Sequence, residues 1–304
     1  MALSRRRKTV VSRVDANPDL GSGADRSPPS RAQRTRARSR RVRRRALLVL
    51  AAVAIVVAAV SVVVTRPGPP GPAAGLSLAF DPAFSGRTLD TGTWDTCYEW
   101  FVPAKGCANF GNQVRDAWYL PSGVRVSGGA LHLVATAKPT RGQTKSGSPL
   151  TYPYTSGMVT TRKSFAFTYG YVQIEARIPG GTGTWPALWL LPKSGAWPPE
   201  IDIMENFGSA HTFNTTLFWS GTAGALDLAR KIPRTSSDLT DGYHTYGLLW
   251  RPHSLIWYLD GQVVHRYTGS HVPRQPMYLL ANLAIDGKAV SGSTFSIRSV
   301  EVYR

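Results

Sequence analysis

Apolar and polar residues alternate along most of the C-terminal three quarters of the chain with the period of two that predicts β-strands. Residues 172–178 and 131–136 both show this alternation. Residues 255–259 and 262–267 are two further apolar-rich runs, separated by Asp260-Gly261. An Asp-Gly pair between two such runs is typical of a β-hairpin with a type I′ turn.

No long segment carries a helical period, and no internal repeat is found. The roughly 230 residues of short strands are enough for one large β-sandwich, so length alone does not demand two domains. We therefore predict an all-β domain over residues 76–304.

A different pattern precedes this domain. Residues 46–64 form an apolar run of nineteen positions broken only by Ser61, just long enough to cross a bilayer as a helix. Four arginines lie between 41 and 45, and only Arg66 follows closely. The positive-inside rule places the N-terminus in the cytoplasm and the domain outside the cell. We expect an uncleaved signal anchor; the alternative, a secreted protein, would need a shorter apolar core and a small-residue cleavage site.

We predict that the segments on either side of the apolar run are unstructured. Residues 1–45 hold fifteen of the 36 Lys and Arg and three of the 18 Asp and Glu, a net charge of +12 that leaves only +6 for the rest. This arm, rich in Arg, Ser and Pro, is expected to be disordered and cytoplasmic. Residues 65–75 are a Pro/Gly linker. A basic arm can bind nucleic acid, but the anchor accounts for its charge, and we expect no nucleic-acid partner.

Within the domain, the run Glu200-Ile201-Asp202-Ile203-Met204-Glu205 places three carboxylates in one strand-like segment. Strict alternation puts Glu200 and Asp202 on one face and Glu205 on the other. One extra residue, a β-bulge at Ile203-Met204, would return Glu205 to the acidic face. Three acids on one face are costly, because like charges repel and each loses water.

Cleavage of a glycosidic bond is a use that fits this cost. Retaining enzymes need two carboxyls about 5 Å apart, one ionised and one protonated. A third carboxyl between them can orient the nucleophile and hold the acid's pKa high. Trp185, Trp189 and Trp197 precede the acids, and flat aromatic faces pack against pyranose rings. An ordinary edge strand with solvated acids and core tryptophans is the alternative, and it would be preferred if the acids stood alone.

At these residues the chain resembles glycoside hydrolase family 16, in the variant with the sequence E-x-D-x-x-E. The resemblance extends over about residues 76–304, in the family's order. It rests on 156–158 (SGM), 169–177 (YGYVQIEAR), 185–192 (WPALWLLP), 244–246 (HTY), 257–261 (WYLDG), 282–284 (NLA) and 300–303 (VEVY).

The resemblance implies a jelly-roll β-sandwich of two curved antiparallel sheets, here preceded by one transmembrane helix, with sugar lying along the concave face. It implies Glu200 as nucleophile, Asp202 as its helper and Glu205 as acid/base. It also makes the chain a monomeric hydrolase whose partner is a polysaccharide, and no cofactor is expected.

Substrate contacts are expected from the three tryptophans together with Asn109, Arg162 and Asn282. Asn109 lies in a loop that also holds Cys97 and Cys107, the chain's two cysteines, and this loop could wall one end of the cleft. For a domain outside the cell, a disulfide between Cys97 and Cys107 is expected.

Two positions depart from the family. Many members bind a structural Ca²⁺ through an acid near the domain start and another in the closing strand, but Arg298 stands where the late acid usually lies. An arginine opposes a cation, so we expect no metal. Phe218 stands where bulge-type relatives often carry His, and this bears on the positioning of the acid/base.

The sequence therefore predicts an endo-acting, retaining β-glycanase. We rank β-1,3-glucan first as substrate, mixed β-1,3/1,4-glucan second and galactans third. A transglycosylase and a non-catalytic glucan-binding module on the same fold are the alternatives. Intact acids argue against the module, because binding alone needs only aromatic and hydrogen-bonding groups.

Overall fold

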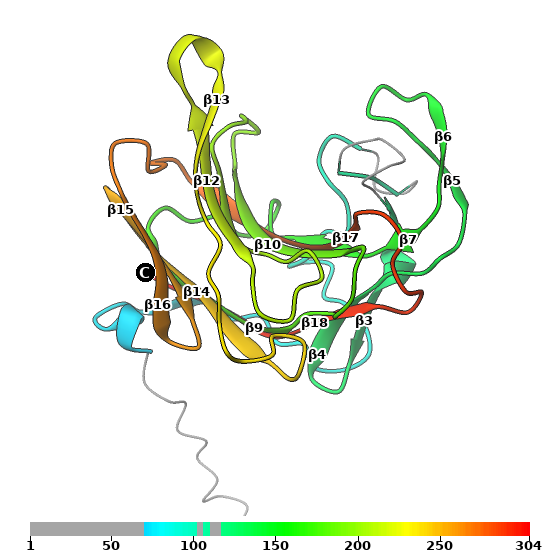
Figure 1. Ribbon diagram of the computed structural model, residues 1–304, viewed down its shortest axis with the longest axis horizontal. Helices are drawn as coiled ribbons and strands as arrows, with labels where there is room; N and C mark the ends of the chain where they lie inside the picture. The colour runs from blue at the N-terminus through cyan, green and yellow to red at the C-terminus, as the bar shows by residue number, and fades with distance from the viewer. Residues whose placement is uncertain (1–69, 102–105, 110–116) are drawn as a thin grey trace, which may run out of the picture. The chain divides into compact units, whose positions relative to one another are not determined.

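The computed structural model describes residues 70–304, apart from 102–105 and 110–116 (Figure 1). The basic arm over 1–45, the predicted anchor over 46–64 and the first part of the predicted linker lie outside the described residues. Among the residues that are described, no helix is long and apolar enough to cross a membrane.

Within the described residues the chain forms two main antiparallel sheets. The first contains β1 Leu78–Phe80, β3 Val124–Ser127, β4 Ala130–Val134, β9 Gly170–Arg177, β14 His244–Arg251, β15 Ser254–Leu259, β16 Gln262–Thr268 and β18 Thr294–Tyr303. The second contains β8 Met158–Thr160, β10 Thr184–Pro192, β11 Glu200–Glu205, β12 Asn214–Ser220, β13 Leu226–Lys231 and β17 Met277–Ile285. We call them the eight-stranded sheet and the six-stranded sheet.

Shorter elements complete the described chain. Two small sheets pair β2 Trp118–Tyr119 with β7 Thr155–Ser156, and β5 Thr140–Gln143 with β6 Pro149–Tyr152. The 3₁₀ turns are η1 Gly71–Ala73, η3 Pro121–Gly123 and η4 Thr222–Gly224. Ala73 is fully buried against Tyr171, Leu249, Tyr258 and Tyr303, so residues before the predicted domain start also pack on the sandwich.

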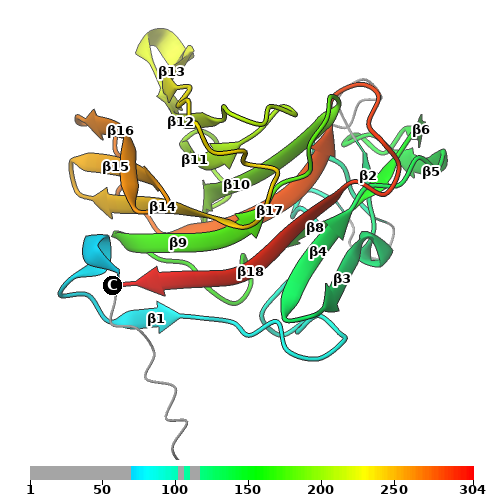
Figure 2. The same ribbon diagram turned by 60° about the horizontal axis from the view of Figure 1, so that its bottom comes forward.

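The two sheets stack as separate layers, which Figure 2 shows with β9 and β18 in one and β10 and β17 in the other. The chain crosses between them repeatedly: β8 joins the six-stranded sheet and β9 the eight-stranded sheet. Strands β10 to β13 then return to the six-stranded sheet, and β14 to β16 return to the eight-stranded sheet. The predicted two-sheet all-β sandwich is confirmed.

The apolar side chains of the predicted alternation fill the space between the two sheets. Val172, Ile174 and Ala176 of β9 are buried in the main core, whereas Gln173 and Glu175 between them are partly exposed. The six-stranded sheet contributes Leu188, Leu190, Ile201, Ile203 and Leu217 to the same core. Its other face is therefore left for polar and aromatic side chains.

The predicted hairpin between β15 and β16 is also confirmed. Leu259 pairs with Gln262, and Asp260 and Gly261 between them have φ angles of 49° and 76°. Positive φ at both central residues defines a type I′ turn, which matches the twist of the strands it joins.

Two hairpins flank the polar face of the six-stranded sheet, on opposite sides of it in Figure 1. One consists of β12 and β13, the edge strand. The other consists of β5 and β6, which packs through Tyr152 on Trp118 with ring centroids 5.2 Å apart. These hairpins bound the face that carries the three predicted acids.

A close approach of two glycines helps to place β17 in this sheet. A Cβ atom on Gly157 would lie 2.4 Å from the carbonyl oxygen of Gly123. Gly157 precedes β8, which pairs with β17, and its carbonyl oxygen accepts from the N–H of Leu283 at 3.2 Å. Only glycine allows η3 and the start of β8 to touch backbone to backbone here.

We expect Gly157→Ala to lower the free energy of unfolding by about 1–3 kcal/mol, because a backbone carbonyl cannot move away from the new methyl group as a side chain can. Urea denaturation measures the change. Gly71→Ala is the matched control, since a Cβ there meets nothing within 4 Å. Equal stability of Gly157→Ala and the wild type would contradict the packing argument.

Candidate active site

The three acids of β11 reach one face through a bulge. On one side of β11, Asp202 pairs with Thr216 and Glu205 with Asn214, so three steps along β11 match two along β12. On the other side, Ile203 has no partner between the pairs Leu188 with Met204 and Trp189 with Asp202. The predicted bulge at Ile203-Met204 is confirmed, and it returns Glu205 to the face of Glu200 and Asp202.

This face lies at the centre of a pocket of about 750 Å³. The lining side chains come from β10 to β13, from β17 and from the loops beyond. They are Glu99, Trp100, Asn109, Lys145, Trp185, Ala187, Trp189, Leu191, Pro192, Gly195, Ala196, Trp197, Glu200, Asp202, Glu205, Phe207, Asn214, Phe218, Arg230, Tyr278 and Asn282. Every residue predicted as catalytic or substrate-binding is among them, except Arg162.

Tryptophan N–H groups hold the two glutamates. The indole of Trp197 donates to Glu200 Oε2 at 2.7 Å, and that of Trp185 donates to Glu205 Oε1 at 2.9 Å. Trp197 is 57% exposed and offers an open ring face, as sugar stacking requires. Two of the three predicted tryptophans therefore contact an acid directly.

Trp189 and Asn282 have a different place. Trp189 is only 5% exposed, and its indole donates to Asn282 Oδ1 at 2.7 Å. Asn282 in turn donates to the Tyr119 hydroxyl at 3.3 Å. These side chains form the hydrogen-bonded floor of the pocket rather than an open stacking surface.

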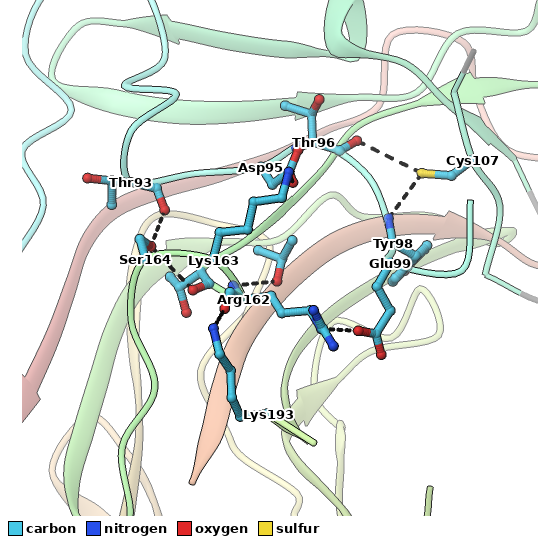
Figure 3. A network of polar contacts seen from close by, with 12 residues as sticks. Thr93, Asp95, Thr96, Tyr98, Glu99, Cys107, Arg162, Lys163, Ser164 and Lys193 are labelled. Carbon is cyan, nitrogen blue, oxygen red and sulfur yellow. Dashed lines mark hydrogen bonds and ion pairs between the residues drawn. The ribbon is translucent and has the colours of Figure 1, made fainter. Parts of the chain in front are cut away.

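Arg162 lies behind the pocket wall. It forms an ion pair with Glu99 (Figure 3). Its guanidinium is 5.8 Å from the ring centroid of Tyr278. Lys193 donates to its backbone carbonyl. Arg162 therefore neutralises Glu99, a pocket residue, and positions it rather than lining the pocket itself.

Sequence reasoning missed several lining side chains, among them Phe207, Arg230, Tyr278 and Lys145. Phe207 is 44% exposed and packs on Trp185, with ring centroids 4.9 Å apart. Arg230, Tyr278 and Lys145 reach the pocket from β13, β17 and the turn between β5 and β6. The alternation of β17 could have placed Tyr278, which lies four residues before Asn282, but the other three depend on which elements pack together.

Phe218, the residue noted in place of the family's His, is the direct cross-strand partner of Glu200. It lines the pocket beside that carboxyl and is itself paired with Leu228 of β13. An apolar ring there removes water from one side of Glu200 and offers no hydrogen bond to it.

Burial dominates the electrostatics of the three acids. It raises the pKa of Glu200 to about 7, against the opposing hydrogen bonds of Trp197 and Asp202. The pKa of Asp202 is raised well above its usual range by burial and by the charges of both glutamates. Burial also raises the pKa of Glu205, whereas the hydrogen bonds of Trp185 and Asp202 and the charge of Arg230 lower it.

These directions identify the carboxyl that is hardest to ionise. Asp202 is 1% exposed and lies between two carboxyls, so it is the acid that is least able to ionise. A protonated Asp202 donates a hydrogen bond to a neighbouring carboxylate and stabilises its charge. The arrangement can thus hold one glutamate ionised and another protonated in the same pocket, as acid–base chemistry requires.

Within the described residues, no group of three or more His, Cys, Asp or Glu could hold a metal ion. Arg298 donates to Glu175 at 2.6 Å and lies 3.8 Å from the ring centroid of Tyr243, on the eight-stranded sheet. The Arg298 side chain is therefore occupied by these two contacts, at the position where many family members carry an acid that binds calcium. The absence of calcium stays a prediction.

The disulfide predicted between Cys97 and Cys107 is not formed in the structure, in which both are buried thiols. The Cys107 sulfur instead accepts from the Tyr98 N–H at 3.4 Å and lies 3.9 Å from the Thr96 carbonyl oxygen (Figure 3). It also lies 3.9 Å from the Met158 sulfur. The aromatic cluster around Tyr98 and Trp118 stabilises this loop by packing.

Fold and site together define a two-sheet β-sandwich with a buried carboxyl cluster in an aromatic-lined pocket. The sequence matches glycosyl hydrolases family 16 over residues 124–296, more than half of its length. The chain belongs to this family.

Named relatives agree with this placement. The endo-1,3-1,4-beta-glycanase EglC of Rhizobium meliloti is 37% identical over 225 residues, which cover 70% of this chain and 47% of EglC. The glucan endo-1,3-beta-glucosidase A1 of Niallia circulans is 28% identical over 256 residues, covering 73% of this chain and 35% of its own length. This chain thus spans about half or less of these two relatives.

A solved structure shows the same architecture. LamAcat from Zobellia galactanivorans superposes with a TM-score of 0.63 and 26% identity, covering 75% of this chain and 98% of LamAcat. The similarity therefore extends over nearly all of that solved chain.

We expect Trp197→Phe to raise the pKa of Glu200 further, because the carboxylate loses the indole N–H that stabilises its charge. A ¹³C NMR titration of protein labelled at glutamate carboxyls measures the shift, with Glu200→Gln assigning the signal. Trp219→Phe is the control, since Trp219 stacks on His271 and does not line the pocket. An unchanged titration midpoint would show that the hydrogen bond does not control this group.

Proposed function

We propose that the domain is an endo-acting β-glucanase that hydrolyses β-1,3- or mixed β-1,3/1,4-glucan with retention of configuration. The observation that carries this proposal is the bulge of β11, which sets three buried carboxyls on one face of a pocket that crosses the sheet. The names of EglC and of the Niallia circulans relative support the substrate class.

The reaction would proceed as a double displacement. A carboxylate oxygen of Glu200 bonds to the anomeric carbon while the glycosidic bond breaks and Glu205 gives its proton to the leaving oxygen. Glu205 then takes a proton from water, whose oxygen bonds to the same carbon and releases the Glu200 carboxylate. Asp202 orients Glu200 and stabilises its charge.

The pocket geometry supports these roles. Its lining runs from Lys145, in the turn of the β5–β6 hairpin, across β17, β10 and β11 to Arg230 on β13. A pocket that crosses the sheet in this way can take the middle of a chain, as an endo-acting enzyme must. Trp197 and Phe207 are open aromatic faces beside Glu200 and Glu205, and they fit neutral pyranose rings.

Two alternatives share this fold. A glucan-binding module would need the aromatic residues but not the three carboxyls. Burying carboxyls costs free energy, and a binding module would gain nothing from it. A transglycosylase would pass the glycosyl group from Glu200 to a sugar hydroxyl instead of water, with the same residues. Product analysis distinguishes all three.

Incubation of residues 67–304 with laminarin, barley β-glucan, agarose and carrageenan tests the substrate class. We expect short oligosaccharides from laminarin first, from barley β-glucan second and least from the two galactans. Oligosaccharides from agarose alone would overturn the ranking, products longer than the substrate would identify transglycosylation, and binding without products would identify a binding module.

The roles are tested on the same substrates. We expect Glu200→Gln to lower kcat by at least about a thousandfold. Glu205→Gln should spare aryl glycosides whose leaving groups need no proton. Asp241→Asn, an exposed acid outside the pocket, is the control. The first product should be the β-anomer by NMR, and an α-anomer would contradict retention.

We further propose that the protein is a monomer held in the cell membrane by residues 46–64, with the domain outside the cell. The arginines before this segment and the Pro/Gly linker after it support this topology.

Protease added to intact cells should release an active fragment that begins within about the linker after Arg66. N-terminal sequencing and activity of the released fragment are the measurements, and a cytoplasmic marker protein that stays intact is the control. Mature protein in the medium that begins near Ala73 without protease would instead show a cleaved signal peptide.

A further inference from the structure

Arg230 is a charged residue of the pocket to which neither sequence pattern nor family resemblance gives a role. It lies on β13, the edge strand, and pairs with Thr216, which pairs with Asp202 on its other side. Residues paired across a sheet share a face, so Arg230 stands two strands from Asp202 on the acidic face. Both Arg230 and Asn214, the partner of Glu205, line the pocket.

The charged groups around Glu205 are unevenly distributed. Glu200 and Asp202 share its strand, and β10 and β12 face it with the uncharged Trp185 and Asn214. Tyr278 of β17, Glu99 and Lys145 line the pocket beyond β10. Glu99 is paired with Arg162, which lies outside the lining. On the β12–β13 side, Arg230 is the cation that the pocket offers to the acids.

Arg230 has no carboxylate of its own within ion-pair distance among the described residues, and its side chain is exposed. Its charge therefore acts on the acids across the pocket, and it lowers the pKa of Glu205 against the larger effect of burial. On the same face of the hairpin, its direct partner Thr216 is uncharged, and the next pair along, Phe218 with Leu228, is apolar.

The two halves of the proposed reaction need opposite states of Glu205. The first half needs the protonated carboxyl, which burial favours. The second half needs the carboxylate. When Glu200 is esterified it carries no charge, and Glu205 is then the glutamate that must ionise against the effect of burial. A fixed cation near Glu205 then favours its carboxylate form.

We propose that Arg230 is a positioning residue of this reaction: its guanidinium stabilises the carboxylate form of Glu205 that the hydrolytic half requires. The inference rests on the proposed function, since it assigns Arg230 to the same site. Arg230 acts through Glu205 and is not itself a proton donor or acceptor.

The pH dependence of hydrolysis tests this role. With a natural β-glucan, the alkaline limb of kcat/KM reports loss of the proton from Glu205 in the free enzyme. With an activated aryl β-glucoside oligosaccharide, hydrolysis of the glycosyl-enzyme limits kcat, and its acid limb reports gain of that proton. Arg230→Met removes the cation, so the Glu205 carboxylate is less stable and both limbs should move to higher pH.

The expected size is modest because Arg230 is exposed. Below the acid limb, kcat on the aryl substrate should fall roughly twofold to fivefold in Arg230→Met, in line with exposed charge pairs. Arg230→Lys should restore most of the wild-type profile. Arg266→Met is the matched control, an exposed arginine on β16 of the other sheet, and its profile should be unchanged. Lower activity with both limbs unmoved would overturn the proposal.

A second measurement needs no substrate. In ¹³C NMR titration of glutamate carboxyls, with Glu205→Gln assigning the signal, Arg230→Met should raise the titration midpoint of Glu205 and Arg230→Lys should not. If the wild type hydrolyses no glucan, the proposed function fails, but this titration still decides whether Arg230 stabilises the carboxylate. An unchanged midpoint would refute the inference even in an active enzyme.

Discussion

The structure depends on one electrostatic constraint: three carboxyls share one face of β11 where water is largely excluded. Asp202, at the centre, is 1% exposed, and burial and the adjacent glutamates raise its pKa well above the usual range. The bulge creates this crowding by turning Glu205 to the face of Glu200. Each glutamate carboxyl then accepts a hydrogen bond from a tryptophan N–H at 2.7–2.9 Å, which stabilises its charge and fixes its position.

The sandwich makes the constraint tolerable by fixing the backbone of β11. This strand lies inside the six-stranded sheet, between β10 and β12, and its apolar residues Ile201 and Ile203 are buried in the main core. From the opposite sheet, the Trp257 indole donates to the Asp202 carbonyl oxygen at 2.8 Å. The acids therefore stand on a strand that cannot shift to relieve their repulsion, and their pKa values change instead.

Hairpins and loops at the edges of the two main sheets complete the lining of the pocket. The β12–β13 hairpin brings Phe218 and Arg230 to one side, and the β5–β6 hairpin brings Lys145 to the other. The loop that contains Cys97 and Cys107 packs through aromatic contacts, with Tyr98 stacked on Trp100 at 4.6 Å. These peripheral elements complete the lining of the pocket, while the proposed chemistry rests on the central strand.

The sequence by itself determined the features that depend on short-range rules. Alternation predicted the strands, Asp260-Gly261 the type I′ turn, and the spacing of Glu200, Asp202 and Glu205 the bulge, because side-chain direction on a strand and backbone φ are local properties. Most of the predicted pocket residues could also be identified from the sequence, because they flank the acids or belong to recognisable motifs.

Only the tertiary structure decided how distant segments meet. The register of β12 with β13 places Arg230 on the acidic face, and the packing of separate loops makes Lys145 and Phe207 pocket residues. The burial of Trp189, the ion pair that withdraws Arg162 from the pocket and the contacts of the Cys107 thiol likewise follow from packing between elements. Such contacts join residues far apart in the chain, and no local pattern specifies them, because strand register and side-chain packing are fixed only when the whole core forms.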